Sequence, residues 1–337
     1  MVLCITRLRY VSNKFVGGAM KRIFLFLSGA LSSTLFAGSI SYYNSSYGEY
    51  GIYTNNTPKY ALYLVNGWVG YRYNDTDSIK FNLQVVNQGG LYPYTNFDFL
   101  NHYYSYNIEA GPGWSRSFSQ GQGSFGINLL GLDWDNYSPS YAINVTGLSL
   151  QPYFYYDAKP GVFYVEGNIQ NVSGNRNLSY FNNITYTQGG IGQMASIEPS
   201  YYQKLNERYT LGSTFKLMFA NDNYYALSGQ TNMGGTNMLE YRPFDVIYSI
   251  QNSPFNLRFY PLIDFYNYIG ASNLPYYNTL TLVPGIEYFQ NINSNSRVFS
   301  EAKLLISNNL VYQNSQGQNK ATAYSAIFTF GIQSYIW

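Results

Sequence analysis

Apolar and polar side chains alternate with a period of two along much of the chain. The clearest case is the stretch 78–88, where Ile79, Phe81, Leu83 and Val85 share one parity and polar residues occupy the other. Successive side chains of a β-strand point to opposite faces, so this pattern predicts a strand between two unlike environments. Helical periodicity does not extend beyond two turns anywhere, and the pattern therefore predicts an all-β chain.

Similar stretches recur from one end of the chain to the other. Nine to eleven tilted residues suffice for a β-strand to cross a bilayer, and most of the stretches reach that length. Their number is about 14, with 12–16 possible: 47–54, 60–73, 78–88, 103–114, 125–133, 141–156, 162–170, 193–203, 208–219, 239–250, 255–268, 277–289, 297–308 and 321–337.

The connections between these stretches alternate between short and longer. Two of them break the alternation, because 53–59 is short where a long one is expected and 116–123 is the reverse. Short turns at one end and longer loops at the other are expected of an antiparallel up-and-down barrel. The short connections are 74–77, 157–161, 204–207, 251–254 and 290–296, and the longer ones are 89–102, 171–192, 220–238 and 309–320.

The last stretch, 321–337, carries apolar residues such as Phe328 on its even positions and ends on Tyr335 and Trp337. A terminal alternating strand that ends on an aromatic residue resembles the closing strand of bacterial outer-membrane β-barrels. The resemblance implies that Tyr335 and Trp337 are an assembly signal read by the barrel-assembly machinery. Because the apolar parity changes near Ser334, we also expect a bulge or a frayed end there.

The start of the chain has the features of a secretory signal peptide. A basic run, 20–22, precedes the apolar residues 23–31, and small residues allow cleavage after Ala37 or Ser39. The apolar run is too short for a spanning helix. Met20 is the natural initiator, so 1–19 is expected to be an upstream extension that is absent from the product.

Removal of residues 1–37 leaves one predicted domain, 38–337, with 14 Lys and Arg against 17 Asp and Glu. Its net charge of −3 gives no reason to expect a nucleic-acid partner. Cys4 is the only cysteine and leaves with the leader, so disulfides and thiolate chemistry are excluded. We expect no cofactor and no metal site.

Charged residues make up 11% of the chain and aromatic residues 19%. Soluble domains have roughly a quarter charged residues. This composition fits either a secreted β-sandwich or solenoid, or a transmembrane barrel with an apolar lipid face and a polar interior. The signal peptide, the loop asymmetry and the terminal aromatic together favour the barrel. We therefore predict a transmembrane antiparallel up-and-down β-barrel of the bacterial outer membrane, in contact with lipid and lipopolysaccharide.

Charged residues within the strands fall mostly on the polar parity, which predicts that they line the lumen. A charge that faces hydrocarbon at the bilayer centre costs a few kcal/mol, so the one-sided placement itself supports the barrel. Glu240 and Arg242 are the exceptions, because they share the parity of Phe244 and Val246; either they lie at the rim or that strand is misphased. The predicted pore-lining residues are Lys80, Glu109, Glu166, Glu198, Lys216, Arg258, Asp264, Glu287, Glu301 and Lys303.

Barrels of eight strands are filled by side chains, whereas 16 strands leave an aqueous channel. About 14 strands therefore predict a wet lumen and a porin-like channel for passive diffusion of small hydrophilic solutes, with weak ion selectivity. The alternative is a binding or adhesion barrel with a plugged lumen that acts through the loops 171–192 and 220–238. An outer-membrane enzyme is the weakest hypothesis.

Enzymatic chemistry finds little support in the sequence. Hydrolases generally need a histidine as base or ligand, and the only one, His102, is expected at a girdle or loop position. Glu166 and Glu198 are separated by the longest predicted loop, so we do not expect them to act as a pair. The acids at 75, 77, 133 and 135 are interpreted as solvated turn residues rather than calcium ligands.

Overall fold

The computed structural model describes most of the chain that follows the predicted leader. Residues 1–37 lie outside it, so the signal peptide stays a prediction. No helix among the described residues is both long and apolar enough to cross a membrane. The described ranges are 39–53, 59–91, 102–118, 122–138, 141–157, 159–179, 185–225, 231–269, 276–314, 317–318 and 322–336.

These residues form fourteen long antiparallel strands and one two-residue strand, β14, beside the end of β13. The strands are 14 to 20 residues long. In order they are β1 (Ser39–Tyr53), β2 (Lys59–Arg72), β3 (Asp77–Leu91), β4 (His102–Ser117), β5 (Gly123–Ser138), β6 (Tyr141–Asp157), β7 (Gly161–Ser179), β8 (Thr185–Lys204), β9 (Tyr209–Tyr225), β10 (Thr231–Ser249), β11 (Phe255–Ile269), β12 (Tyr276–Asn293), β13 (Ser296–Asn314), β14 (Gly317–Gln318) and β15 (Thr322–Ile336).

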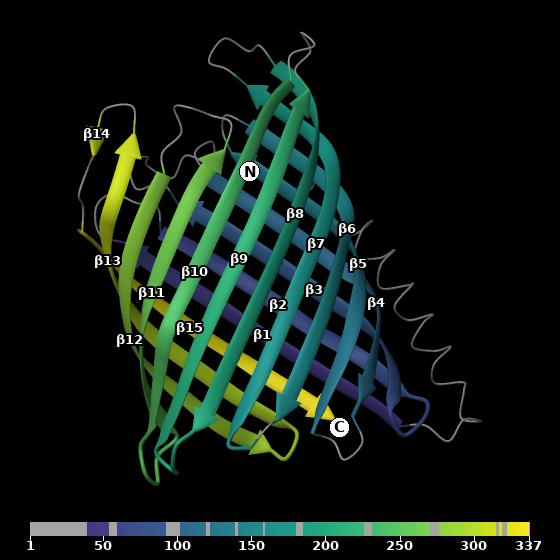
Figure 1. The fold of residues 1–337 in the computed structure, drawn as a ribbon, viewed down its shortest axis with the longest axis vertical. Helices are drawn as coiled ribbons and strands as arrows, with labels where there is room; N and C mark the ends of the chain where they lie inside the picture. Colours follow the sequence, from purple (N-terminus) through teal and green to yellow (C-terminus); the bar gives the residue numbers. More distant parts are fainter. Residues whose placement is uncertain are drawn as a thin grey trace, which may run out of the picture. The chain divides into compact units, whose positions relative to one another are not determined.

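The strands close into a barrel (Figure 1). Each long strand pairs with its neighbours in sequence, β13 pairs with both β12 and β15, and β15 pairs with β1. Closure pairs the backbone amide and carbonyl groups within the protein, which is what a lipid environment requires. The predicted all-β up-and-down barrel of about 14 strands is confirmed.

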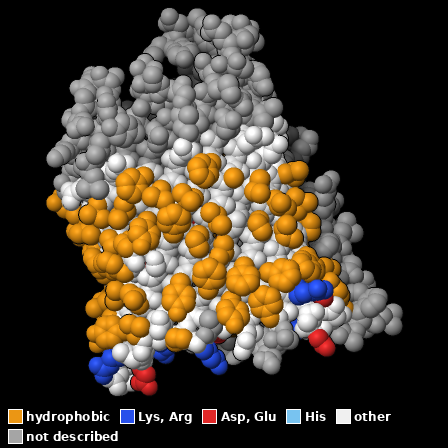
Figure 2. All heavy atoms as spheres, in the orientation of Figure 1, with side chains coloured by type: hydrophobic (Ala, Val, Ile, Leu, Met, Phe, Trp, Pro, Cys, Tyr) orange, Lys and Arg blue, Asp and Glu red, His pale blue; other side chains and the backbone are white. Residues whose placement is uncertain are grey.

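The two faces of the wall differ as the alternation predicts. Large apolar side chains on the outer face are exposed, among them Ile79 at 49%, Ile197 at 47% and Phe328 at 49%. On the inner face small polar groups such as Ser149 and Thr329 are buried. Figure 2 shows the outer hydrophobic side chains as a belt, with the charged side chains of this face at its lower edge. Such a belt is the surface that contacts lipid.

The strands extend much further than the apolar alternation predicts. The expected loops 171–192 and 220–238 are wrong in large part, because β7 continues to Ser179, β8 starts at Thr185 and β9 continues to Tyr225. In the added strand segments the sequence has no apolar alternation and is rich in Asn, Ser, Gly and Thr. The strands continue to pair there although apolar residues no longer alternate with polar ones. Sequence periodicity therefore does not predict these parts of the strands.

The predicted bulge near the end of the closing strand is also wrong. The register of β15 with β1 continues unshifted from Ser325 to Ile336, and Ser334 pairs with Asn44. The apolar parity therefore changes because the residue types change, while the strand pairing stays regular. Tyr335 stays in that ladder opposite Tyr43, and its amide donates to the carbonyl of Asn295, just before β13, at 2.8 Å. Trp337 lies outside the described residues, and the assembly signal remains a prediction.

A bulge does occur in β10. Its register with β9 shifts by one residue between Arg242 and Asp245, at Pro243 and Phe244. Proline cannot donate to a ladder and is tolerated in strands mainly at such irregular positions. The extra residue places Glu240 and Arg242 on the inner face, while Phe244 is 41% exposed outside. Of the two explanations for these charges, the misphased strand is correct.

Candidate functional site

The register places all ten predicted pore-lining residues on the inner face of the wall. Along the ladder Lys80 lies opposite Gly113, Glu166 opposite Glu198, and Glu287 opposite Glu301. Further charged residues have the same inward parity but were missed or left unassigned by the sequence, among them Glu49, Glu240, Arg242 and Asp245. Asp245 was missed because the bulge reverses the parity of β10 just before it.

Arg258 binds two carboxylates of the inner face of β8 to β13. Its Nε donates to Oδ1 of Asp245 at 2.9 Å, and its Nη1 donates to Oε1 of Glu287 at 3.0 Å. The hydroxyl of Tyr202 donates to the other oxygen of Asp245 at 3.0 Å. The side chain of Asp245 is fully buried and that of Arg258 is 20% exposed. Hydrogen bonds from a guanidinium are the usual way to stabilise a buried carboxylate.

Three more ion pairs lie on the inner face of β8 to β13. We call this face the paired wall. Lys303 Nζ lies 2.8 Å from Glu301, Lys216 Nζ 3.1 Å from Glu198, and an Arg242 nitrogen 3.3 Å from Glu240. Like charges directly opposite in a ladder are destabilising. The cations therefore compensate the Glu287 and Glu301 pair that the register brings together.

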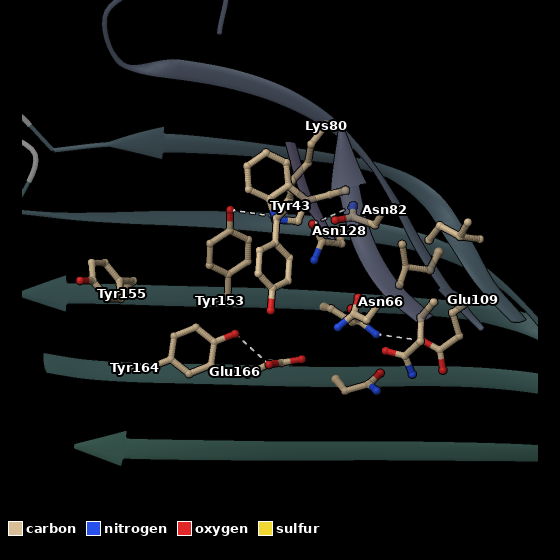
Figure 3. A pocket seen from close by; sticks show the side chains of 16 residues that line it. Tyr43, Asn66, Lys80, Asn82, Glu109, Asn128, Tyr153, Tyr155, Tyr164 and Glu166 are labelled. Atoms are coloured by element: carbon tan, nitrogen blue, oxygen red, sulfur yellow. Dashed lines mark hydrogen bonds between the residues drawn. The ribbon is translucent and has the colours of Figure 1, made fainter. Parts of the chain in front are cut away.

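The inner face on the other side of the barrel, from β1 to β7, surrounds a cavity of about 420 Å³ (Figure 3). We call this face the open wall. Lys80 is its only lysine lining the cavity; Nζ donates to the hydroxyl of Tyr153 at 3.1 Å and lies 4.4 Å from the centroid of that ring. A Cβ at Gly113 would lie 3.0 Å from Cε of Lys80 and 2.9 Å from Nδ2 of Asn82. Glycine at this position leaves room for both side chains.

The two carboxylates of the open wall that line the cavity have neutral partners. Glu109, 8% exposed, accepts from Nε2 of Gln151 at 3.1 Å and from Nδ2 of Asn107 at 3.4 Å. Glu166 accepts from the hydroxyl of Tyr164 at 2.8 Å. The five ion pairs just described lie on the paired wall, and Lys80, Glu109 and Glu166 belong to none of them.

Amide side chains fill the space between these charges. Asn82 Nδ2 donates to Oδ1 of Asn128 at 3.3 Å, and Ser149 donates to Oδ1 of Asn168 at 2.9 Å. Asn66 and Gln151 also line the cavity. Each amide offers both donors and an acceptor. The open wall can therefore form hydrogen bonds with both the donors and the acceptors of a polar molecule.

Other groups considered for chemistry are placed differently from the sequence expectation. Glu166 and Glu198 are direct cross-strand partners, because the expected loop between them is mostly the paired strands β7 and β8. Glu198, however, is bound to Lys216. His102 is the first residue of β4, so of its two expected positions the loop is wrong. Within the described part of the chain, no group of three His, Cys, Asp or Glu could hold a metal ion.

The four acids interpreted as turn residues divide between turn and strand. Asp75 lies in the turn before β3, and Asp77 is the first residue of that strand, where Arg116 Nε donates to it at 2.7 Å. Asp133 and Asp135 lie in β5 on its outward parity, so the turn interpretation is wrong for them. Asn144 on β6 donates to Asp135 at 2.5 Å.

A closed barrel of 14 long strands, an apolar outer belt and a charged, polar inner face together define the class: a transmembrane β-barrel of the bacterial outer membrane. No family model matches the chain, and no curated protein matches it.

Solved structures of outer-membrane barrels share the fold. A Pseudomonas aeruginosa FadL homologue matches with a TM-score of 0.53 at 10% identity, over 88% of this chain and 90% of that one. The CymD monoaromatic hydrocarbon channel gives 0.48 at 9% identity, over 88% of each chain. OmpT, an outer-membrane protein of Vibrio cholerae, gives 0.44 at 12% identity, over 89% of this chain and 98% of that one. The first of these similarities establishes the barrel fold and nothing finer.

Proposed function

We propose that the protein is a passive channel for small polar solutes across the outer membrane. The observation that carries the proposal is the open wall, where a cavity of about 420 Å³ is lined by amides, phenols and charges outside ion pairs. Small-molecule sites generally occupy roughly 300–1,000 Å³. All described elements belong to the barrel wall, so no described segment fills the lumen as a plug.

The division between the walls supports the same proposal. On the paired wall most of the charges are held in ion pairs, and the main effect of these pairs is to stabilise the sheet. On the open wall the polar groups have capacity left for a passing solute, because an amide or carboxylate with one or two neutral partners can accept or donate further. The solute path would therefore follow the open wall.

The alternative of a binding barrel that acts through loops 171–192 and 220–238 is less well supported, because these segments are mostly strand. The absence of enzymatic activity stays a prediction. A channel for apolar solutes is disfavoured by the amides and charges around the cavity, since burying such groups against an apolar molecule leaves hydrogen bonds unmade.

Single-channel recording tests the proposal with two neighbouring variants of β5. Asn128 lines the cavity, whereas Ile127 is on the outer face with 39% exposure. We expect the protein, purified from membranes and reconstituted, to conduct ions. Asn128→Trp should reduce the conductance by narrowing the lumen, and Ile127→Trp should leave it unchanged. Folded, heat-modifiable protein without any conductance would refute the channel.

A further inference from the structure

The cavity of the open wall separates positive from negative charge. In Figure 3 Lys80 lies above both carboxylates, with Glu166 at the lower left and Glu109 at the right, and Asn128 lies between Lys80 and Asn66. Along the ladder Glu109 is opposite Gln84, four residues from Lys80 on the same strand. At roughly 3.3 Å per residue this offset is about 13 Å between backbone positions.

This separation contrasts with the paired wall of the same barrel. There each ion pair joins its two partners at 3.3 Å or less. On the open wall the lysine instead lies against Tyr153, with Trp68 at 6.0 Å, and the carboxylates accept from amide and phenol groups. Both signs of charge thus remain available to a third molecule in the space between them.

We propose that the cavity binds a small zwitterion, a di- or tripeptide with free ends, as the channel's preferred solute. The carboxylate of the solute lies at Lys80, and its ammonium group lies at Glu109 and Glu166. The peptide groups between its ends bind the amides of Asn66 and Asn128. The inference rests on the proposed function, because it names the solute class of that channel.

The alternatives fit the same cavity less well. An anion would be attracted by Lys80 and repelled by the two carboxylates, and a cation would meet the opposite arrangement. A neutral solute could use the amides but would leave the charges without a counterpart. An extended dipeptide or tripeptide spans roughly 7–11 Å, which suits the backbone offset once the reach of the Lys80 side chain is subtracted.

Equilibrium binding tests the inference independently of conduction. The protein, expressed with its own leader and extracted from membranes, is titrated by calorimetry with triglycine and with triglycine acetylated at its N-terminus and amidated at its C-terminus. We expect at least tenfold tighter binding of triglycine. Equal affinity for the two ligands would overturn the proposal.

Variants of the charged residues then test whether Lys80, Glu109 and Glu166 bind the peptide. Lys80→Met and the double variant Glu109→Gln/Glu166→Gln should each weaken triglycine binding about tenfold or more, towards the affinity of the blocked ligand. Lys216→Met is the matched control, because Lys216 lies on the paired wall, outside the cavity. A loss at Lys216→Met equal to that at Lys80→Met would contradict the site, provided that both variants keep the heat-modifiable folded form.

The two proposals can fail separately. Preferential binding of triglycine by a protein that does not conduct would remove the channel and keep the zwitterion site. Conductance without a preference for triglycine would keep the channel and remove the zwitterion site.

Discussion

Removing the guanidinium of Arg258 should destabilise the barrel more than removing any other single cation of the paired wall. Arg258 binds Asp245 and Glu287, whose side chains are 0% and 9% exposed. Arg258→Met would keep much of the volume of the side chain but leave both carboxylates without their cation. The lysine in the Lys216–Glu198 pair offers a comparison, because those side chains are 33% and 43% exposed.

The expected magnitudes follow from burial. Breaking a buried pair by removing one partner costs about 3–5 kcal/mol, because the remaining charge is buried without compensation. An exposed pair is worth about 0–1 kcal/mol. We therefore expect Arg258→Met to lower the free energy of unfolding by about 3 kcal/mol or more, and Lys216→Met to lower it by less than about 1 kcal/mol.

Reversible urea unfolding in lipid vesicles, followed by tryptophan fluorescence, measures both values. Adding Asp245→Asn to Arg258→Met should recover part of the loss, because the amide no longer carries a buried charge. Losses within about 1 kcal/mol of each other for the two single variants would show that the lumen solvates Asp245 and Glu287 as well as it does Glu198, and the assignment of a buried charge network would be refuted.

Two further predictions concern the faces of the wall. Ile197→Arg should destabilise insertion into vesicles by about 2–4 kcal/mol because it places a cation in hydrocarbon, whereas Ser196→Arg, on the inner face, should be tolerated; equal losses would show that the register of β8 is wrong. In a salt gradient, Glu109→Gln/Glu166→Gln should shift the reversal potential towards anion preference and Lys80→Met towards cation preference. Shifts of the same sign in single-channel recordings would exclude control of selectivity by the open wall.

Sequence periodicity predicted the class of fold and the inward face because the two sides of the wall meet different solvents. In the stretch 78–88 each outward residue faces lipid and each inward one faces the lumen, so the alternation is a direct record of the environment. At 171–179, where apolar residues do not alternate with polar ones, the sequence gives no such signal. The strands were therefore predicted too short at these ends, while the number of strands was predicted correctly.

The division of the inner charges into two walls could not be predicted in the same way. Whether a cation meets a carboxylate depends on contacts between distant segments, such as Lys80 with Tyr153, which are 73 residues apart. Parity tells only that both side chains point inward. The cavity likewise depends on which inward positions carry small residues at one level of the barrel, and Gly113 has no signature in a single sequence.

The bulge in β10 affects both the predicted strand faces and the predicted pairing of the inner charges. With an unbroken ladder, Glu240 and Arg242 would share one face and Asp245 the other, so one group or the other would face lipid. An arginine at the bilayer midplane costs about 2–4 kcal/mol on that face. The extra residue at Pro243 and Phe244 turns all three charges inward, where Asp245 meets Arg258 and Glu240 meets Arg242. The paired wall therefore depends on this irregularity of the sheet, and periodicity fails in β10 because a one-residue insertion reverses parity.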